Sequence, residues 1–210
     1  MTGEQKRVGV IDNFDIKEIH YGSKSIITTG KHSSLFLVKH CDNSFDHQFN
    51  SLTDSKELFS DKGREYIFLI REPIDRFMSG LLHEWVGCVK PFFKGFDIPY
   101  THKNIVKSIN YHFIYLLLDS SLFSHSFHVG NWLELACFSK FINAAPNINF
   151  VNYEDRVKLY KRLNIDKEPP VNVSPDKFKI YFNDLSNKTQ DIIKSYLENE
   201  LKYYNYIFQR

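Results

Sequence analysis

The hydrophobic pattern is strongest between residues 65 and 85. Five consecutive apolar residues, 66–70, predict a β-strand that is buried on both faces, as strands of parallel sheets are. Pro73 cannot continue a central strand, but it suits the first turn of a helix. Beyond it the apolar residues recur at helical spacing, at Ile74, Phe77, Met78, Leu81, Leu82 and Trp85. This stretch therefore predicts a strand, a sharp turn and a helix.

Weaker patterns on both sides predict the other elements. Residues 24–29 predict a β-branched strand that runs into a glycine turn. Apolar spacing predicts helices over 104–118 and 132–143, and Ser186 can cap a helix that continues to about Tyr203. Residues 8–11 predict a short edge strand, whereas residues 35–65 predict a connecting segment. We therefore expect an α/β fold, with a parallel sheet flanked by helices, in a single domain over residues 1–210.

Polar residues at the strand–helix junction suggest an anion site. Arg71 follows the buried strand directly, at the carboxyl end where open α/β sheets bind ligands. Arg76 and Ser79 are three residues apart, so they share one side of the predicted helix, off its apolar face. Two guanidinium groups, a hydroxyl and a helix N-terminus suit a phosphate group. The alternative is two surface arginines and a solvated serine.

The segment Arg-Glu-Pro-Ile-Asp-Arg-Phe-Met-Ser, residues 71–79, resembles the 3′-phosphate-binding motif of sulfotransferases. These enzymes use 3′-phosphoadenosine-5′-phosphosulfate (PAPS), and the motif runs arginine, acidic, proline, aliphatic, any, arginine, apolar, any, serine. The resemblance implies that Arg71 and Ser79 bind the 3′-phosphate and that Arg76 is a supporting cation. It also implies a P-loop NTPase-like architecture, with PAPS as co-substrate and 3′-phosphoadenosine-5′-phosphate (PAP) as product. Glu72 stands where aspartate is commoner, and the extra methylene is expected to weaken a helix-capping role.

A second phosphate-binding segment is predicted where the first strand ends. Gly30 and Lys31 precede two hydroxyls, Ser33 and Ser34, and such a turn can hold a phosphate group. It is similar to the 5′-phosphosulfate loop of the sulfotransferases, although the order differs and the proline is missing. The resemblance implies that Lys31 stabilises the bridging oxygen and that the two serines bind the 5′-phosphate. An ordinary strand-to-helix turn is the alternative.

The catalytic base is expected between these two segments. The family places a histidine or glutamate there, near a strand end, which makes His47 or His40 the candidate. A surface role for each histidine is the alternative. No spacing of histidine, cysteine or acidic residues indicates a metal site.

Further contacts follow only from the resemblance. His128 and Asn131 are similar to a histidine–glutamine pair of carbohydrate-type members, which implies contacts with the acceptor. Asn172 and Ser174 resemble an Asn-x-Ser loop that closes over the cofactor. Residues 148–155 resemble a late family strand that ends in Tyr-Glu-Asp, where the acidic pair opens the next helix.

Charge and hydropathy narrow the choice of partners. The chain has 27 basic and 25 acidic residues, a net charge of +2, so it lacks the footprint of a nucleic-acid-binding protein. The first seven residues are polar and no apolar run approaches the ~18 residues of a membrane span, so we expect a cytoplasmic protein without a membrane anchor.

The sequence thus predicts a sulfotransferase that moves a sulfuryl group from PAPS to a hydroxyl or amine of a carbohydrate or small molecule. Two alternatives remain. A P-loop kinase-like phosphotransferase would need Gly-x-x-x-x-Gly-Lys-Ser/Thr, of which only Gly30-Lys31 is present. A non-catalytic nucleotide-binding protein of the same fold would tolerate the altered first loop.

Overall fold

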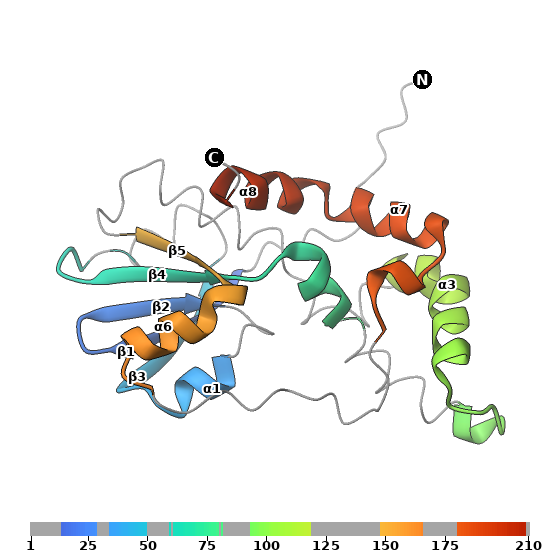
Figure 1. Cartoon of the computed structure of the whole chain (residues 1–210), viewed down its shortest axis with the longest axis horizontal. Helices are drawn as coiled ribbons and strands as arrows, with labels where there is room; N and C mark the ends of the chain where they lie inside the picture. Colours follow the sequence, from blue (N-terminus) through green and yellow to red (C-terminus); the bar gives the residue numbers. More distant parts are fainter. Residues whose placement is uncertain are drawn as a thin grey trace.

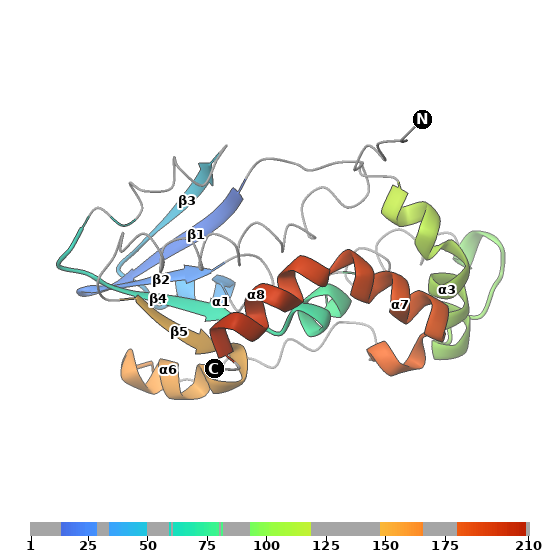
Figure 2. The same ribbon diagram turned by 90° about the horizontal axis from the view of Figure 1, so that it is seen from above.

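A computed structural model describes residues 14–28, 34–49, 59, 61–79, 81, 93–118, 148–165 and 180–208. In this part of the chain one β-sheet carries helices on both faces, and a group of helices lies beyond one edge of the sheet (Figure 1). Viewed from above, α7 and α8 run across the molecule and connect these two regions (Figure 2). The expected α/β class is therefore confirmed.

The sheet has five strands in the order β3-β1-β2-β4-β5. Their bounds are Phe14–Tyr21 for β1, Lys24–Thr28 for β2, Asn43–Phe49 for β3, Glu65–Ile70 for β4 and Ile148–Asn152 for β5. β1 pairs antiparallel with both β2 and β3, whereas β2, β4 and β5 pair in parallel. The sheet is thus mixed, and the prediction of a parallel sheet was wrong on the side of β1 and β3.

A tight turn at Gly22 explains the antiparallel part. Gly22 has a φ of +56°, in the left-handed region that favours glycine, and with Ser23 it joins β1 to β2. Because β1 alone is reversed, the other four strands point the same way. Their carboxyl ends, at Thr28, Phe49, Ile70 and Asn152, therefore share one edge of the sheet, the carboxyl edge.

Neither β1 nor β3 was predicted from the sequence. In β1 one face alternates Ile16 with Glu18 and the other alternates Lys17 with the buried Ile19, so neither face is apolar throughout. In β3 the described side chains from Asn43 to Asp46 are exposed. The edge strand predicted over residues 8–11 lies outside the described residues.

Helices cover both faces of the sheet. The short helices α1, Ser34–Val38, and α6, Arg156–Arg162, lie on one face, and α8, Glu198–Phe208, lies on the other (Figure 1). In β4, Ile67 and Leu69 face α1 and α6, whereas Phe68 and Ile70 face the side of α8. All four are fully buried, so the predicted strand with two buried faces is confirmed.

A separate cluster of apolar residues lies beyond the carboxyl edge. The helix over residues 73–79 packs its apolar side against α3, His102–Leu118, and α7, Asn187–Tyr196. The buried members include Phe77, Met78, Leu81, Ile105, Ile109, Ile193 and Leu197. The predicted helices over 104–118 and after Ser186 are thereby confirmed, except that the last one divides at Leu197 into α7 and α8. The helix after β4 is confirmed over residues 73–79 and at Leu81, whereas its predicted end at Leu82–Trp85 and the helix predicted over 132–143 lie outside the described residues.

The ends of two helices follow the expected capping rules. Ser186 Oγ accepts a hydrogen bond of 3.3 Å from the Thr189 amide at the start of α7. Asn164 has a φ of +56°, and its amide donates to the Lys161 carbonyl oxygen where α6 ends. No helix in the described part of the chain is long and apolar enough to cross a membrane.

Candidate functional site

The two predicted phosphate-binding segments begin on neighbouring strands. β2 and β4 pair in parallel, so their last residues, Thr28 and Ile70, lie on neighbouring strands at the carboxyl edge. After β4 the chain enters the helix over residues 73–79, and α1 begins at Ser34. Gly30, Lys31 and Ser33, which come between β2 and α1 in the sequence, lie outside the described residues. The two predicted segments thus start from neighbouring strand ends, where open α/β sheets bind ligands.

Arg71 lies at the carboxyl edge, as predicted, and contacts the next strand's end. Its guanidinium carbon is 5.2 Å from the centroid of the Tyr153 ring, within the range of a cation–π interaction. Its Nε atom is buried and has no hydrogen-bond partner among the described residues. Buried polar nitrogen atoms are nearly always hydrogen-bonded in proteins, so this atom is suited to a ligand oxygen.

A second guanidinium group, which sequence reasoning missed, contacts the same ring. The guanidinium carbon of Arg156 is 4.3 Å from the Tyr153 centroid, and its Nη1 donates a 3.0 Å hydrogen bond to the Tyr153 carbonyl oxygen. The same nitrogen is 4.0 Å from the exposed Glu154 carboxylate. Tyr153 therefore contacts two cations at the carboxyl edge. The sequence feature that could have identified Arg156 is its position directly after Tyr-Glu-Asp, the segment that follows a strand.

Glu72 caps the helix that begins after β4. Its Oε2 accepts a 2.8 Å hydrogen bond from the Asp75 amide, and its carbonyl oxygen accepts one of 2.9 Å from the Arg76 amide. Glutamate thus makes the capping bond that we expected its length to weaken. Burial raises the pKa of Glu72, against the effect of the Asp75 and Ile74 amides. The helix N-terminus already has a carboxylate ligand, so a phosphate here would depend on side chains.

Arg76 is buried, so the alternative of a surface arginine is wrong for this residue. It is only 3% exposed, and the nearby Glu200 of α8 is 6% exposed. Burial lowers the pKa of Arg76, whereas the charge of Glu200 raises it; the positive charge of Arg71 adds to the lowering. Arg76 therefore contributes its charge from within the protein. Ser79, one helical turn further on, is half-buried.

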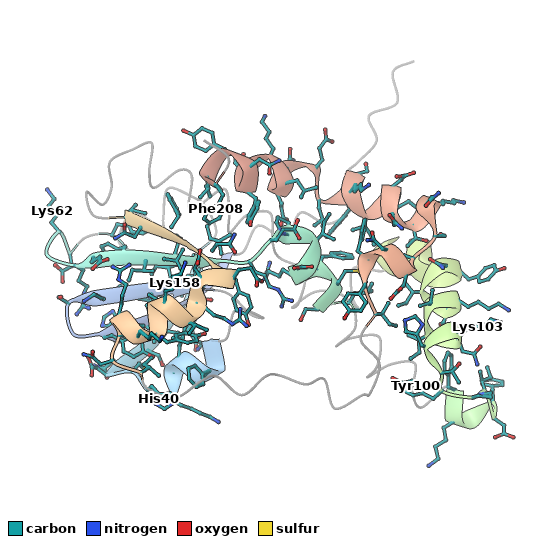
Figure 3. All side chains as sticks on the ribbon, viewed as in Figure 1. His40, Lys62, Tyr100, Lys103, Lys158 and Phe208 are labelled. Carbon is teal, nitrogen blue, oxygen red and sulfur yellow. The ribbon has the colours of Figure 1, made fainter. Side chains whose placement is uncertain are left out.

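The two candidate bases lie at different edges of the sheet. The segment that holds His40 and Asp42 follows α1. The Gly22 amide donates a 2.6 Å hydrogen bond to Asp42 Oδ2, and the Asp42 amide donates to the His20 carbonyl oxygen. These hydrogen bonds place the segment beside the β1–β2 turn. That turn is at the edge opposite Arg71. His40 itself is exposed, at the end of α1 (Figure 3). Its position does not favour a role beside Arg71.

His47 lies toward the carboxyl edge. The residues Phe45, Glu18, Ile27 and Phe68 are paired in turn across β3, β1, β2 and β4. His47 is two residues beyond Phe45, and Ile70 is two residues beyond Phe68, in the same direction. Since side chains alternate along a strand, His47 also shares the face of Ile70. Its side chain is 28% exposed.

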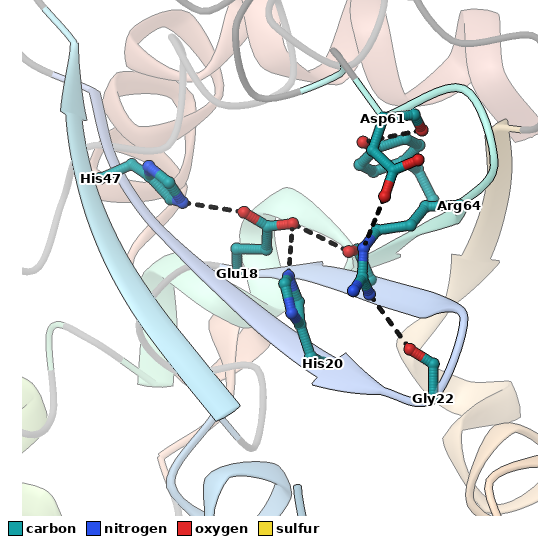
Figure 4. Close-up of polar contacts among 8 residues, drawn as sticks. Glu18, His20, Gly22, His47, Asp61 and Arg64 are labelled. Carbon is teal, nitrogen blue, oxygen red and sulfur yellow. Dashed lines mark hydrogen bonds and ion pairs between the residues drawn. The ribbon is translucent and has the colours of Figure 1, made fainter. Parts of the chain in front are cut away.

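A buried glutamate holds His47. Glu18 Oε2 is 2.9 Å from His47 Nε2, and Glu18 Oε1 is 2.8 Å from both His20 Nε2 and Ser25 Oγ (Figure 4). Sequence reasoning missed Glu18 and His20, since both lie in a strand that it did not predict. Nearby, Arg64 contacts Asp61 and the Gly22 carbonyl oxygen and so supports the β1–β2 turn (Figure 4).

The remaining predicted contacts cannot be placed. His128, Asn131, Asn172 and Ser174 lie outside the described residues. The chain matches no protein-family model, no curated protein and no solved structure. The residues at the carboxyl edge therefore provide the structural basis for a function.

Proposed function

We propose that this protein transfers a sulfuryl group from PAPS to a hydroxyl or amine of a carbohydrate or small molecule and releases PAP. The observation that carries the proposal is the position of Arg71. It follows β4 at the carboxyl edge, beside the strand that leads to Lys31, and its buried Nε lacks a partner in the described part of the chain. The residues 71–79 supply the resemblance to the 3′-phosphate motif.

In this proposal the 3′-phosphate is held by side chains. Arg71 and Ser79 contact it, and Arg156, which contacts the same Tyr153 ring as Arg71, provides a second guanidinium group. Arg76 stays buried and adds positive potential. Glu72 occupies the Asp75 amide, so the helix N-terminus is a minor contributor.

The reacting end of PAPS is assigned to the turn after β2. Lys31 stabilises the charge that develops on the bridging oxygen, and Gly30, Ser33 and Ser34 bind the 5′-phosphate. Asn172 and Ser174 remain predicted cofactor contacts, and His128 and Asn131 remain predicted acceptor contacts. None of these assignments requires a metal ion.

The chemical step needs a base for the acceptor. The acceptor oxygen or nitrogen forms a bond to sulfur while the bond from sulfur to the 5′-phosphate oxygen breaks, and PAP leaves with that electron pair. His47 accepts the proton that the acceptor loses, because a neutral imidazole is a base near neutral pH. Of the two histidines first considered, its position toward the carboxyl edge favours it over His40.

Ligand-dependent stability tests the proposal. Saturating PAP, at 100 times its Kd, should add about 2.7 kcal/mol to the free energy of unfolding, and PAPS should be consumed, slowly by hydrolysis even without an acceptor. Stabilisation by ATP but not by PAP would instead support the kinase-like phosphotransferase. Binding of PAP without any PAPS consumption would support a non-catalytic nucleotide-binding protein.

A further inference from the structure

Glu18 is an acidic side chain inside the sheet that no proposed cofactor contact uses. It is 8% exposed, on the central part of β1, on the face that α8 covers. A buried carboxylate is unfavourable unless hydrogen bonds stabilise it. Here the donors are a serine and two histidines, and no arginine or lysine pairs with it among the described residues. Its environment is therefore built from imidazole groups.

The two histidines lie on opposite sides of Glu18. His20 pairs with Ser25 in the register of β1 and β2, next to the turn at Gly22 and away from the carboxyl edge. His47 extends in the other direction, toward the carboxyl edge. Glu18 Oε1 is used by His20 and Ser25, which leaves Oε2 directed at His47 (Figure 4). His20 and Ser25 thus hold one oxygen of the Glu18 carboxylate, and the other oxygen faces His47, the histidine nearer to the carboxyl edge.

We propose that Glu18 is the positioning residue of His47: it accepts a hydrogen bond from Nε2–H and so makes Nδ1 the nitrogen that takes the acceptor's proton. The inference rests on the proposed function, since it concerns the proposed base. An ionised carboxylate can only accept hydrogen bonds, so the nitrogen that faces it carries the hydrogen. In a neutral imidazole the other nitrogen then holds the lone pair. A base whose second nitrogen is held by a carboxylate is a recurrent catalytic arrangement.

Other polar groups around Glu18 do not replace this role. Tyr66, on β4, is close enough that burial and the Glu18 charge raise its pKa, which keeps the phenol neutral. The Asp61 carbonyl oxygen accepts a 3.3 Å hydrogen bond from the Tyr66 hydroxyl, and Arg64 contacts Asp61 and the Gly22 carbonyl oxygen. The contact between Glu18 and His47 Nε2 is therefore one that orients the His47 ring.

The tautomer of His47 provides a test that needs no activity. The whole protein is labelled with nitrogen-15 in its histidines, and ring spectra are recorded at about pH 8.5, where imidazoles are generally neutral. The His47 signals are assigned by their loss in His47→Gln. We expect the Nε2–H form. The Nδ1–H form would overturn the inference, because Nε2 could not then donate to Glu18.

Kinetics test whether Glu18 acts through His47. PAPS hydrolysis is the assay, since the acceptor is not identified. His47→Gln should lower kcat by about 10²–10⁴-fold. Glu18→Gln should lower kcat by at least about 10-fold but by no more than His47→Gln does, and the KM for PAPS should stay unchanged. In the His47→Gln background, Glu18→Gln should then change kcat by less than about 2-fold. An equal loss in both backgrounds would show that Glu18 supports only the fold.

Asp46→Asn is the matched control. Asp46 is next to His47 on β3 but faces the other side of the sheet, where it forms an ion pair with Lys17. The variant removes a carboxylate from the same strands and should leave kcat within about 2-fold of the unaltered protein. A loss as large as that of Glu18→Gln would contradict the inference. Absence of PAPS hydrolysis in the unaltered protein would contradict the proposed function, and the tautomer measurement would still decide the role of Glu18.

Discussion

Arg76 and Glu200 are both buried, and the charge of each acts on the other. Arg76 belongs to the helix that follows β4, and Glu200 belongs to α8 near the end of the chain. Their interaction joins the helix of the candidate site to the helix that covers the sheet. Two buried ions are expensive to desolvate, so this pair makes the stability of the protein sensitive to pH and to the loss of either partner.

The pH dependence follows from Glu200. Burial raises its pKa above the ordinary value of 4.5, although the charge of Arg76 opposes the shift. The folded state therefore binds the proton more tightly than the unfolded chain, and the stability that this contributes is present below about pH 4.5 and lost as the pH rises. The free energy of unfolding of Glu200→Gln should therefore rise relative to that of the unaltered protein as the pH increases from about 5 to about 8. The rise should be at most about 1.4 kcal/mol per pH unit. Urea unfolding at several pH values measures this, and a pH-independent difference would contradict it.

Loss of Arg76 should be more severe. Arg76→Met leaves the Glu200 carboxyl buried without its neighbouring cation, and breaking a buried pair in this way destabilises proteins by about 3–5 kcal/mol. Adding Glu200→Leu should recover part of the loss, because no buried charge then remains. Urea unfolding of the single and double variants at about pH 9, above the pKa of about 8 of Glu200, where this carboxyl is ionised, provides the comparison. If the double variant is less stable than Arg76→Met, the two residues do not act as a pair.

The capping role of Glu72 predicts a smaller effect. Glu72→Ala removes the acceptor of the Asp75 amide and should lower the free energy of unfolding by about 1 kcal/mol, within the usual range of roughly 0.5–2 kcal/mol. Glu72→Asp keeps a carboxylate at the cap, so its free energy of unfolding should be within about 0.5 kcal/mol of that of the unaltered protein. Thermal unfolding measures both. Equal losses for alanine and aspartate would indicate that the carboxylate does not stabilise the helix.

Local patterns were sufficient to predict the centre of the fold. The apolar run at 66–70 and the proline at 73 determine the structure of residues next to them in the sequence. The strand over 65–70 and the helix that begins at Pro73 are accordingly confirmed. The antiparallel strands were missed because Glu18 interrupts the apolar face of β1 and because β3 is largely exposed. The Gly22-Ser23 dipeptide was a usable sign of a hairpin, but alternating apolar residues did not flank it.

The candidate site was predictable only where it follows a strand directly. Arg71 was placed correctly because its position depends on the end of β4. The burial of Arg76 depends on α8, and the hydrogen bond between Glu18 and His47 depends on the pairing of β1 with β3. These partners are far apart in the sequence, and no local pattern specifies which residues a strand or helix will contact.

Two arginines of α6 test the second cation of the proposed phosphate site. Arg156→Ala should weaken PAP binding by about 10- to 150-fold, the equivalent of roughly 1.5–3 kcal/mol for a charge-assisted hydrogen bond. Arg162→Ala is the matched control, because Arg162 ends the same helix but pairs with Glu65 at the opposite edge of the sheet. Calorimetric titration with PAP compares the two. Similar losses for both variants would show that only net charge matters.

The most direct test of the proposal compares two nucleotides that differ only in the 3′-phosphate. Titration calorimetry gives the affinities of PAP and of adenosine 5′-monophosphate for the unaltered protein and for Arg71→Ala. We predict that the unaltered protein binds PAP more tightly, and that Arg71→Ala weakens PAP by about 10- to 150-fold while it changes the monophosphate little. Equal affinities of the unaltered protein for the two nucleotides, or equal losses in Arg71→Ala, would contradict the assignment of Arg71 to the 3′-phosphate of PAPS.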